Sequence, residues 1–275
     1  MKRRENILNF ISIVILLSMF TISMVPVAIM FIRSWKTLPQ TGRSQIFPTL
    51  PLHYGNYVEA WALVSRYLVN TVFVVVWAVV GVVLLSSITA YVFARYKFPG
   101  KNFMFAVLLA LLMIPSVIGF VPSIVLVLKI FRLQNNFLGV LFPYWAGGQV
   151  FAIYVLRTFF EGLPEEMFEA ARLDGAGHFD LYWRITLPLS GSILSVIAIL
   201  NIIGTWNDYV WPLIVLASES KRTIAVGLTF LRDTKQPDPG VEMACYVIAS
   251  IPMFILFLAT MKTFVRGIAS GALKA

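Results

Sequence analysis

Six stretches of the sequence are apolar and almost free of charge, and each is long enough to cross a lipid bilayer. A helix needs about 20 apolar residues to span the hydrocarbon core. One stretch, Ile185–Ser218, contains a single charged residue, Asp208. The other five contain no Asp, Glu, Lys or Arg and extend over Ile7–Ile32, Tyr67–Ala94, Asn102–Leu128, Phe137–Leu156 and Met243–Met261. The sequence therefore predicts six membrane-spanning helices.

The same stretches decide the fold class. Inside a bilayer every backbone N–H and C=O must be hydrogen-bonded within the protein, which leaves helices and closed β-barrels as spanning structures. The stretches are continuous and lack the alternation of apolar and polar residues, over about 10 positions, that marks barrel strands. Charged residues make up 13% of the chain, against about 25% in a soluble domain. We predict an all-α integral membrane protein and exclude an ordinary soluble globule.

The sequence offers little material for catalysis or for binding a metal or nucleotide. His53 and His178 are the two histidines and fall in predicted loops on opposite sides of the membrane, and Cys245 is the single cysteine. A thiolate metal site or a serine–histidine pair in the bilayer is therefore hard to assemble. Gly100-Lys101 is not part of a phosphate-binding loop, because the upstream glycine of that motif is missing. We expect no catalytic residue, no metal and no cofactor in this chain.

Positive charges predict how the chain is inserted. Lys2, Arg3 and Arg4 precede the first apolar stretch, and cations beside the first span favour a cytoplasmic N-terminus. That stretch is too long for the apolar part of a signal peptide, so a retained helix is expected. With six spans, both termini and the loops at 95–101 and 157–184 lie on the cytoplasmic side of the cell membrane. The formal net charge is +9. Outside the spans these charges form no basic face on which nucleic acid could bind, so lipid headgroups are their expected partner.

The sequence also predicts a simple domain organisation. No internal repeat or low-complexity linker is visible, so residues 70–264 are taken as one membrane domain. Residues 1–69 add a helix and an extracytoplasmic loop, and residues 265–275 form a cytoplasmic tail. In the outer loop, Asn56–Trp61 has the aromatic residues that favour the membrane interface. The sequence is compatible there with either a short interfacial helix or a plain connecting loop.

The segment 157–184 has a reversed charge pattern. Anionic lipid attracts basic segments at the cytoplasmic surface, but this segment holds six of the 13 acidic residues of the chain: Glu161, Glu165, Glu166, Glu169, Asp174 and Asp180. A protein partner explains that pattern better than lipid does. The alternative is a plain connection between two spans, but connections between helices usually have about 2 to 8 residues.

Local signals predict two short helices in this segment. Pro164 suits the first position of a helix, and the acidic residues after it favour the positive end of the helix dipole. The pair Asp174-Gly175 is typical of a turn, and a second helix is expected from shortly after it to near Pro188. Small, acidic and aromatic side chains, Phe168 among them, then form a docking face.

The residues of this segment resemble a known motif. Glu169-Ala170-Ala171, then Asp174-Gly175-Ala176, then Ile185, Leu187 and Pro188 are similar to the EAA loop of binding-protein-dependent ABC transporter permeases. The resemblance extends to Asn70-Thr71, Leu163-Pro164-Glu165-Glu166, Trp206–Leu213, Phe264–Gly267 and Ser270–Lys274. Together these residues resemble the maltose-type, MalG-like branch of carbohydrate permeases, most firmly over residues 70–264.

The resemblance implies a fold, a set of partners and a coupling site. The fold is that of a type I importer permease, which has no nucleotide site of its own. Its partners are two cytoplasmic ATPase subunits that bind the ATP, a second homologous permease and an extracytoplasmic solute-binding protein. The solute is expected to be a carbohydrate or oligosaccharide, while a glycerol phosphate or another polar solute stays open. The residues that contact an ATPase and transmit its movement are, by the same resemblance, Glu169, Ala170, Ala171, Asp174, Gly175 and Ala176, with Gly175 supplying a positive φ.

A second polar group falls inside the fifth apolar stretch. Asn201, Thr205 and Asp208 are spaced i, i+4 and i+7, which predicts one shared face of a helix. A charge within a span usually faces the bundle interior or a water-filled cavity. One interpretation is that these residues, with Trp206, line the translocation path. The other is that Asp208 pairs with neighbouring helices and sets the geometry of the bundle.

The main alternative function is a secondary transporter in which Asp208 carries a coupling ion. Transport by such a protein stops with an uncoupler and is indifferent to ATP depletion. The lack of inverted repeats and of further carboxylates in the apolar stretches argues against it. An ion channel is a weaker third option, because no segment resembles a selectivity filter.

Overall fold

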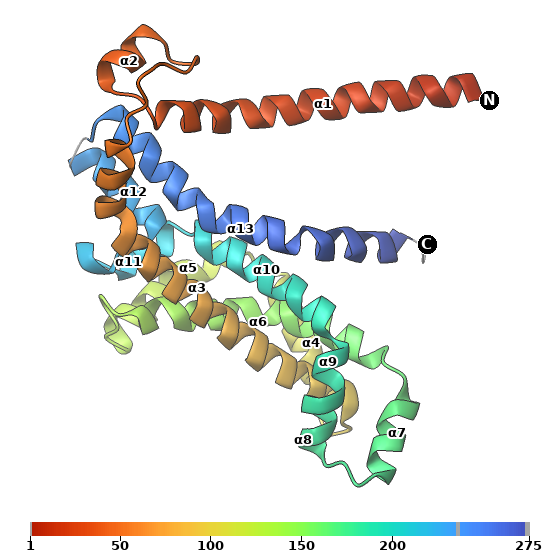
Figure 1. Ribbon diagram of the computed structural model, residues 1–275. Helices are drawn as coiled ribbons and strands as arrows, with labels where there is room; N and C mark the ends of the chain where they lie inside the picture. The colour runs from red at the N-terminus through yellow and green to blue at the C-terminus, as the bar shows by residue number, and fades with distance from the viewer. Residues whose placement is uncertain (1, 235–236, 273–275) are drawn as a thin grey trace. The chain divides into compact units, whose positions relative to one another are not determined.

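The computed structural model is helical in all of its regular elements, over the backbone of residues 2–234 and 237–272 that it describes (Figure 1). Side chains are described for residues 9–233 and 237–261. The predicted all-α fold class is confirmed. The stretch Phe264–Lys274, which contributed to the family resemblance, lies outside the residues whose side chains are described.

The helices follow one another with short connections. The longer ones are α1 (Lys2–Arg33), α3 (Gly55–Arg95), α4 (Lys101–Leu112), α5 (Ser116–Ile124), α6 (Phe137–Glu161), α7 (Glu165–Leu173), α10 (Gly191–Asn207), α12 (Ile224–Thr234) and α13 (Pro239–Ala272). The shorter ones are α2 (Leu38–Arg43), η1 (Val125–Ile130), α8 (His178–Asp180), η2 (Leu181–Thr186), α9 (Leu187–Leu189), α11 (Val210–Val215) and η3 (Glu219–Lys221).

Several of these helices are long and apolar enough to cross a membrane, alone or as bent pairs. Among the described residues, four qualify alone: α1 from Asn9 onward, α3, α6, and α13 as far as Met261. Two pairs qualify together, each bent sharply at a short break. These are α4 with α5 and η1, bent by 93°, and α8–α9 with α10, bent by 75°. If each pair crosses the membrane once, the total is the six spans that the sequence predicts.

The third predicted span is not one straight helix. α4 ends at Leu112 and α5 begins at Ser116, and Pro115 between them has φ −58° and ψ 128°. Proline has no N–H to donate and disfavours helical geometry at the residue before it. These two properties explain the break within a continuous apolar stretch.

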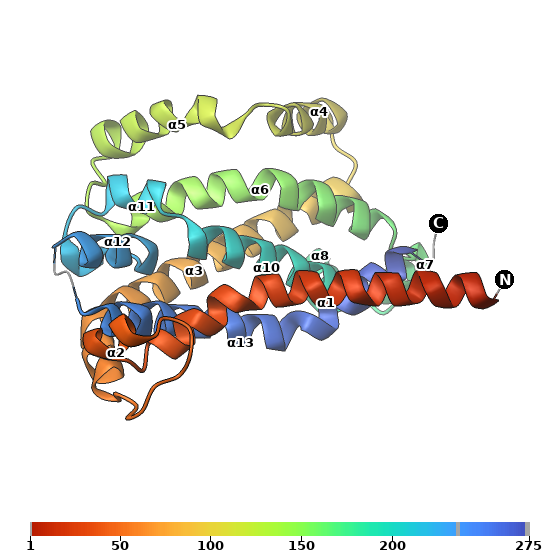
Figure 2. The same cartoon turned by 90° about the horizontal axis from the view of Figure 1, so that it is seen from above.

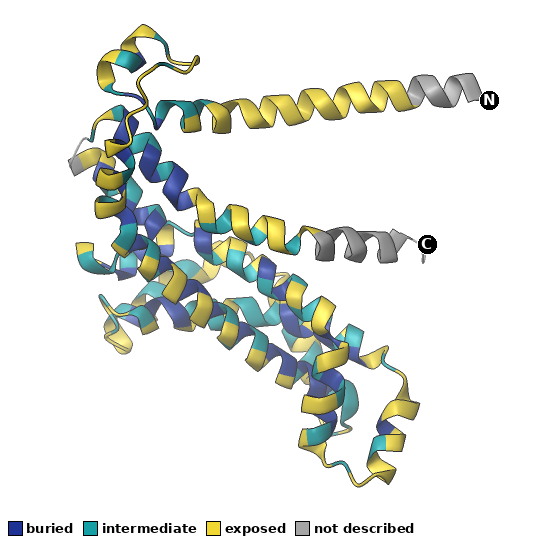
Figure 3. Ribbon diagram, in the orientation of Figure 1, coloured by how far each residue is buried: buried dark blue, intermediate teal, exposed yellow. Residues whose placement is uncertain are grey.

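The chain divides into two compact units, which are described separately. The first comprises residues 1–66 and 227–252, and the second comprises residues 67–226 and 253–275. The boundaries at residues 69 and 264 expected from the sequence stay a prediction. In the first unit, α1 is exposed along almost all of its described length (Figure 3).

The segment after α1 folds around a buried lysine. Lys36 is 1% exposed, and its Nζ donates hydrogen bonds to the carbonyl oxygens of Ser44 (2.7 Å) and Phe47 (2.6 Å). Burial lowers the pKa of Lys36, and the nearby charge of Arg33 lowers it further. The two carbonyl groups provide the hydrogen bonds that a buried ammonium requires, so Lys36 organises the loop from within.

α3 begins in the same outer region as a single long helix. It continues from Gly55 to Arg95, so the short helix expected at Asn56–Trp61 is wrong, and so is the plain connecting loop. No proline interrupts the sequence there. The Nδ2 atom of Asn56 donates to the carbonyl oxygens of Ser34 and Lys36, at 2.9 Å each. These bonds hold the start of α3 against the outer segment.

Two clusters of buried apolar side chains hold the second unit together. One joins α3, η1, α6 and α11 and consists of Val74, Ala78, Val127, Val140, Leu141, Trp211, Val215 and Leu216. The other, called the loop cluster below, joins α3, α6, α7, η2 and α10. It consists of Val82, Ala90, Tyr91, Phe93, Ala152, Ile153, Leu156, Phe160, Phe168, Leu181, Tyr182 and Ile197. α4 contacts α6 at one edge of this unit (Figure 2).

Candidate functional site

The loop between α6 and α10 folds into the two short helices that the sequence predicts. α7 is the first, and its first turn holds Glu165 and Glu166. Pro164 stands one position earlier than expected, directly before the helix. The second helix is made of α8, η2 and α9, from His178 to Leu189. Figure 1 shows α7 alongside this second helix at one end of the unit.

The turn after α7 depends on a glycine. Gly175 has φ +84°, a conformation that costs other residues strain. Its N–H donates to the carbonyl oxygen of Arg172 (3.0 Å), and the N–H of Ala176 donates to that of Ala171 (2.9 Å). This is a Schellman arrangement, which satisfies the last carbonyl groups of a helix. The positive φ predicted at Gly175 is confirmed, and it is needed for the backbone alone, because a Cβ there would meet nothing within 4 Å.

The loop is packed into the core of the unit. Phe168 of α7 is 0% exposed, and Leu181 and Tyr182 of η2 join it in the loop cluster. Tyr182 Oη and Ser87 Oγ of α3 form a hydrogen bond of 2.8 Å. The predicted place of Phe168 on a docking face is wrong, since its side chain is entirely covered by the core.

Arg95, the last residue of α3, fastens the start of α7. Its Nη2 donates to the carbonyl oxygens of Phe160 (2.7 Å) and Leu163 (2.9 Å), where α6 ends. Its Nη1 donates to Glu165 Oε2 at 2.5 Å, and its Cζ lies 3.8 Å from the centre of the Phe168 ring. The side chain of Arg95 is only 8% exposed. Sequence analysis missed this residue, although a cation directly at the end of a long apolar stretch was an available signal.

The six residues expected to contact an ATPase divide between two sides of the loop. Four of them are exposed: Glu169, Ala170, Asp174 and Gly175. Ala171 and Ala176 are half-buried and pack against the loop cluster. Leu173 is 90% exposed on the open side of α7, although it is a large apolar residue. The structure thus forms an open face, called the α7 face below, from the four exposed residues and Leu173, while contact with an ATPase stays a prediction for all six.

The polar stripe predicted in the fifth span is interrupted. α10 ends one residue before Asp208, which has φ −70° and ψ 122°. Asp208 therefore does not share a helix face with Asn201 and Thr205, because helical spacing no longer applies beyond the end of the helix. Its carboxylate accepts hydrogen bonds from Tyr144 Oη (2.8 Å) and from the backbone N–H of Trp211 (3.3 Å). Both contacts fit the interpretation that Asp208 sets helix geometry, here by tying α6 to the start of α11.

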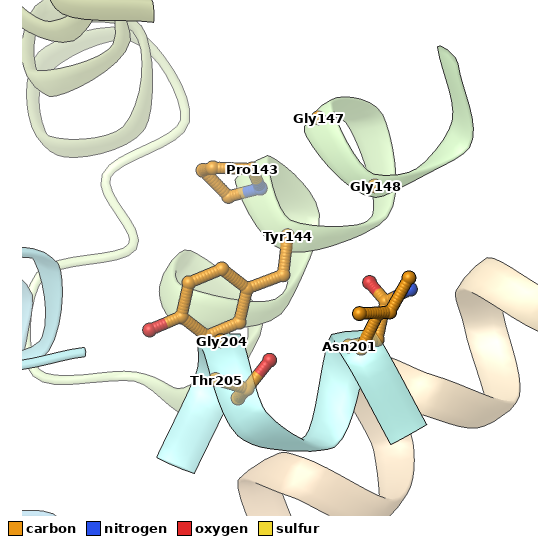
Figure 4. Close-up of a pocket in the computed structure, with 8 residues that line it drawn as sticks. Pro143, Tyr144, Gly147, Gly148, Asn201, Gly204 and Thr205 are labelled. Atoms are coloured by element: carbon orange, nitrogen blue, oxygen red, sulfur yellow. The ribbon is translucent and has the colours of Figure 1, made fainter. Parts of the chain in front are cut away.

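Asn201 and Thr205 do line a pocket between α6 and α10 (Figure 4). The pocket has a volume of about 250 Å³, and its other lining residues are Pro143, Tyr144, Gly147, Gly148, Leu200 and Gly204. Trp206 is 8% exposed and is not part of the lining, nor is Asp208. The structure therefore brings together two of the four residues expected along a translocation path, and that role stays a prediction.

The fold and the site define a class of protein. In the described part of the chain, membrane-spanning helices carry a packed acidic loop at one end, and no group of residues is arranged to hold a metal ion. These features define an integral membrane protein with a packed loop outside its spans. The chain belongs to the family of binding-protein-dependent transport system inner membrane components, whose model matches residues 53–270. The family resemblance found in the sequence is confirmed.

Individual relatives agree with this family. The chain is 38% identical over 223 residues to the probable ABC transporter permease protein YurM of Bacillus subtilis, covering 81% of this chain and 74% of the relative. It is 32% identical over 240 residues to the arabinooligosaccharides transport system permease protein AraQ of Halalkalibacterium halodurans, covering 86% and 85%. It is 30% identical over 271 residues to the diacetylchitobiose uptake system permease protein NgcG of Streptomyces coelicolor, covering 96% and 88%.

A solved structure supports the fold. A chain of a bacterial ABC transporter involved in the import of the acidic polysaccharide alginate superimposes with a TM-score of 0.81. The sequences are 22% identical, and the match covers 94% of this chain and 97% of the other. At that identity the likeness concerns the fold alone.

Proposed function

We propose that this chain is the permease subunit of an ATP-driven importer for a carbohydrate or oligosaccharide. Relatives named for arabinooligosaccharides and diacetylchitobiose support this class of solute. In the proposal the chain is inserted with both termini in the cytoplasm. It works with two ATPase subunits, a second permease of similar fold and an extracytoplasmic solute-binding protein, and the partners bind the ATP.

The α7 face carries the proposal. It is a short helix with an acidic first turn, held rigidly by the loop cluster and Arg95, that presents exposed small and apolar residues outward. Leu173, at 90% exposed, adds nothing to the packing of the loop, and it lies beside the exposed small residues of the same face. A cytoplasmic ATPase that covers this residue would remove its apolar surface from water and could push on the loop.

Replacement of Leu173 by arginine should abolish coupling. A charge placed in a covered apolar contact stays unpaired and desolvated, which costs several kcal/mol. We expect the ATPase subunits to be lost on co-purification, and ATP-dependent uptake of labelled saccharides into vesicles containing the full complex to fall to less than about a tenth. Leu50→Arg is the matched control, because Leu50 is 85% exposed and lies far from α7 in the sequence. If Leu173→Arg keeps both the ATPase and the uptake, the α7 face is not the contact.

A panel of labelled saccharides and glycerol phosphates in the same vesicles identifies the solute.

Replacement of Asp208 by asparagine separates the proposal from ion-coupled transport. The asparagine carbonyl oxygen still accepts a hydrogen bond from the Trp211 N–H, and the amide NH2, in place of Oδ2, donates one to Tyr144 Oη. Exchanging a charged for a neutral hydrogen-bond partner lowers stability by about 1 to 1.5 kcal/mol for each bond and removes no group that an ATP-driven cycle requires. We therefore expect the Asp208→Asn variant to keep at least about half of the ATP-dependent uptake. An uncoupler should change neither the variant nor the wild type. Uptake that disappears with the uncoupler and survives ATP depletion would instead identify a secondary transporter.

A further inference from the structure

A second pocket lies where α4 begins. It has a volume of about 420 Å³ and is formed by the connection after α3, the first turn of α4 and one residue of α6. Its lining residues are Lys97, Phe98, Gly100, Lys101, Asn102, Phe103 and Arg157. The lining includes three cations and no carboxylate, and none of these residues belongs to the α7 face or to the pocket beside α10.

The positive charge of this pocket is only partly neutralised. Arg157 Nε donates to Glu161 Oε1 at 2.8 Å, which holds the guanidinium in place. Lys101 Nζ donates to the carbonyl oxygen of Tyr96 at 3.1 Å, a neutral partner. Within the described side chains, neither Lys97 nor Lys101 forms an ion pair with a carboxylate. The pocket therefore keeps two ammonium groups available to an anion.

We propose that this pocket binds the phosphate group of an anionic phospholipid. A phosphodiester carries a negative charge and oxygen acceptors that suit ammonium and guanidinium donors. α4 begins at Lys101, so the positive end of its helix dipole adds to the attraction. A zwitterionic headgroup brings its own cation, which three neighbouring cations repel. Phosphatidylglycerol is therefore preferred to phosphatidylcholine.

The exposure of α4 identifies a lipid, rather than free phosphate, as the ligand. No residue of α4 is buried, and Phe103 and Met104 are 74% and 54% exposed. α4 packs on α6 with one side only, at the edge of the unit (Figure 2), and its open apolar side contacts acyl chains. The pocket stands at the first turn of that helix, where charged residues meet apolar ones, which is the level of the headgroups. A lipid bound here places its phosphate among the cations and its chains along Phe103.

The test measures lipid binding to the purified full-length protein in detergent by native mass spectrometry. The protein is titrated with phosphatidylglycerol, with phosphatidylcholine, and with phosphatidylglycerol in the presence of inorganic phosphate. The variant Lys97→Gln/Lys101→Gln removes the two available charges. Lys129→Gln/Arg132→Gln removes two exposed charges elsewhere in the same unit and is the matched control. Elution of each variant as a single species on size exclusion checks its fold, and Lys97→Gln alone provides a milder change at an exposed position.

We expect saturable binding of phosphatidylglycerol to wild type, weakened about tenfold or more in Lys97→Gln/Lys101→Gln and about threefold in Lys97→Gln. The control variant and inorganic phosphate at millimolar concentration should leave binding unchanged. Equal weakening in both double variants would overturn the proposal, because it means that only net charge matters. Displacement of the lipid by inorganic phosphate, or equal binding of phosphatidylcholine, would also overturn the assignment to an anionic lipid. Lipid binding is measured without transport, so this result is independent of the proposed function.

Discussion

Replacement of Arg95 by alanine is expected to loosen α7 and to uncouple it from the membrane helices. The change removes the donors of the Phe160 and Leu163 carbonyl groups and the cation beside Glu165. A hydrogen bond to a charged group contributes about 1.5 to 3 kcal/mol, and the pairing with half-exposed Glu165 adds little. A net loss of about 2 kcal/mol in local stability corresponds to roughly 30-fold faster hydrogen exchange of the α7 amides. Uptake by the assembled transporter should fall in parallel.

The matched control for this prediction is Arg184→Ala. Arg184 also pairs with an acidic residue of the loop, Asp180 at 3.1 Å, but its side chain is 78% exposed. Surface pairs contribute about 0 to 1 kcal/mol, so exchange in α7 should change by less than about fivefold. Arg95→Lys keeps the charge but lacks the planar guanidinium that reaches several acceptors. We therefore expect hydrogen exchange of the α7 amides at a rate between those of wild type and Arg95→Ala. Unchanged exchange in Arg95→Ala would show that the loop cluster alone holds α7.

Replacement of Gly240 by alanine is expected to destabilise the first unit strongly. Gly240 lies in the first turn of α13, where its N–H is capped by Asp238 Oδ1 at 2.9 Å. A Cβ at this position would overlap the carbonyl oxygen of Lys36 and come within 2.5 Å of Asn56 Nδ2. The nearest atom belongs to the backbone and cannot rotate away, so the cost should reach the upper end of the range for overpacking, about 3 kcal/mol. We expect the thermal midpoint of the detergent-solubilised protein to fall by about 6 to 12 °C.

Gly42→Ala provides the comparison for Gly240→Ala. Gly42 lies in the short helix α2 of the same unit, and a Cβ there would meet nothing within 4 Å. Alanine is favoured over glycine in a helix by about 1 kcal/mol, so the midpoint should stay the same or rise slightly. Both variants are measured by the loss of the size-exclusion peak after heating. Equal midpoints for Gly240→Ala and wild type would mean that the start of α13 shifts away from Lys36 without cost.

The sequence predicted those parts of the structure that depend on local signals. Apolar stretches without charge locate the spans because the cost of burying a charge in lipid is large. Pro164 and the pair Asp174-Gly175 locate α7 because they act on the backbone of their own segment. The φ of +84° at Gly175 is the clearest case, since its cause lies within a single turn.

The parts that could not be predicted depend on contacts between distant segments. Arg95 and Phe160 meet only after α3 and α6 have packed, and no spacing in the sequence indicates that contact. Helical periodicity placed Asp208 with Asn201, but it assumes a continuous helix and does not show where one ends. Periodicity likewise gives Phe168 a side of α7 without showing which side meets the core. Composition and spacing thus locate the helices of the site. Contacts with distant segments determine which of their side chains are buried and which stay exposed to a partner.

The shared packing of Phe168, Leu181 and Tyr182 with α3, α6 and α10 holds the loop against these three spans through side chains, although the chain itself is interrupted between α9 and α10, which are bent by 75°. If a partner pushes on α7, as we propose, these shared side-chain contacts pass the displacement on to the three spans. Bending during a transport cycle is easiest where the chain is already interrupted: at Pro115 between α4 and α5, at Ser190 between α9 and α10, and at Asp208 between α10 and α11.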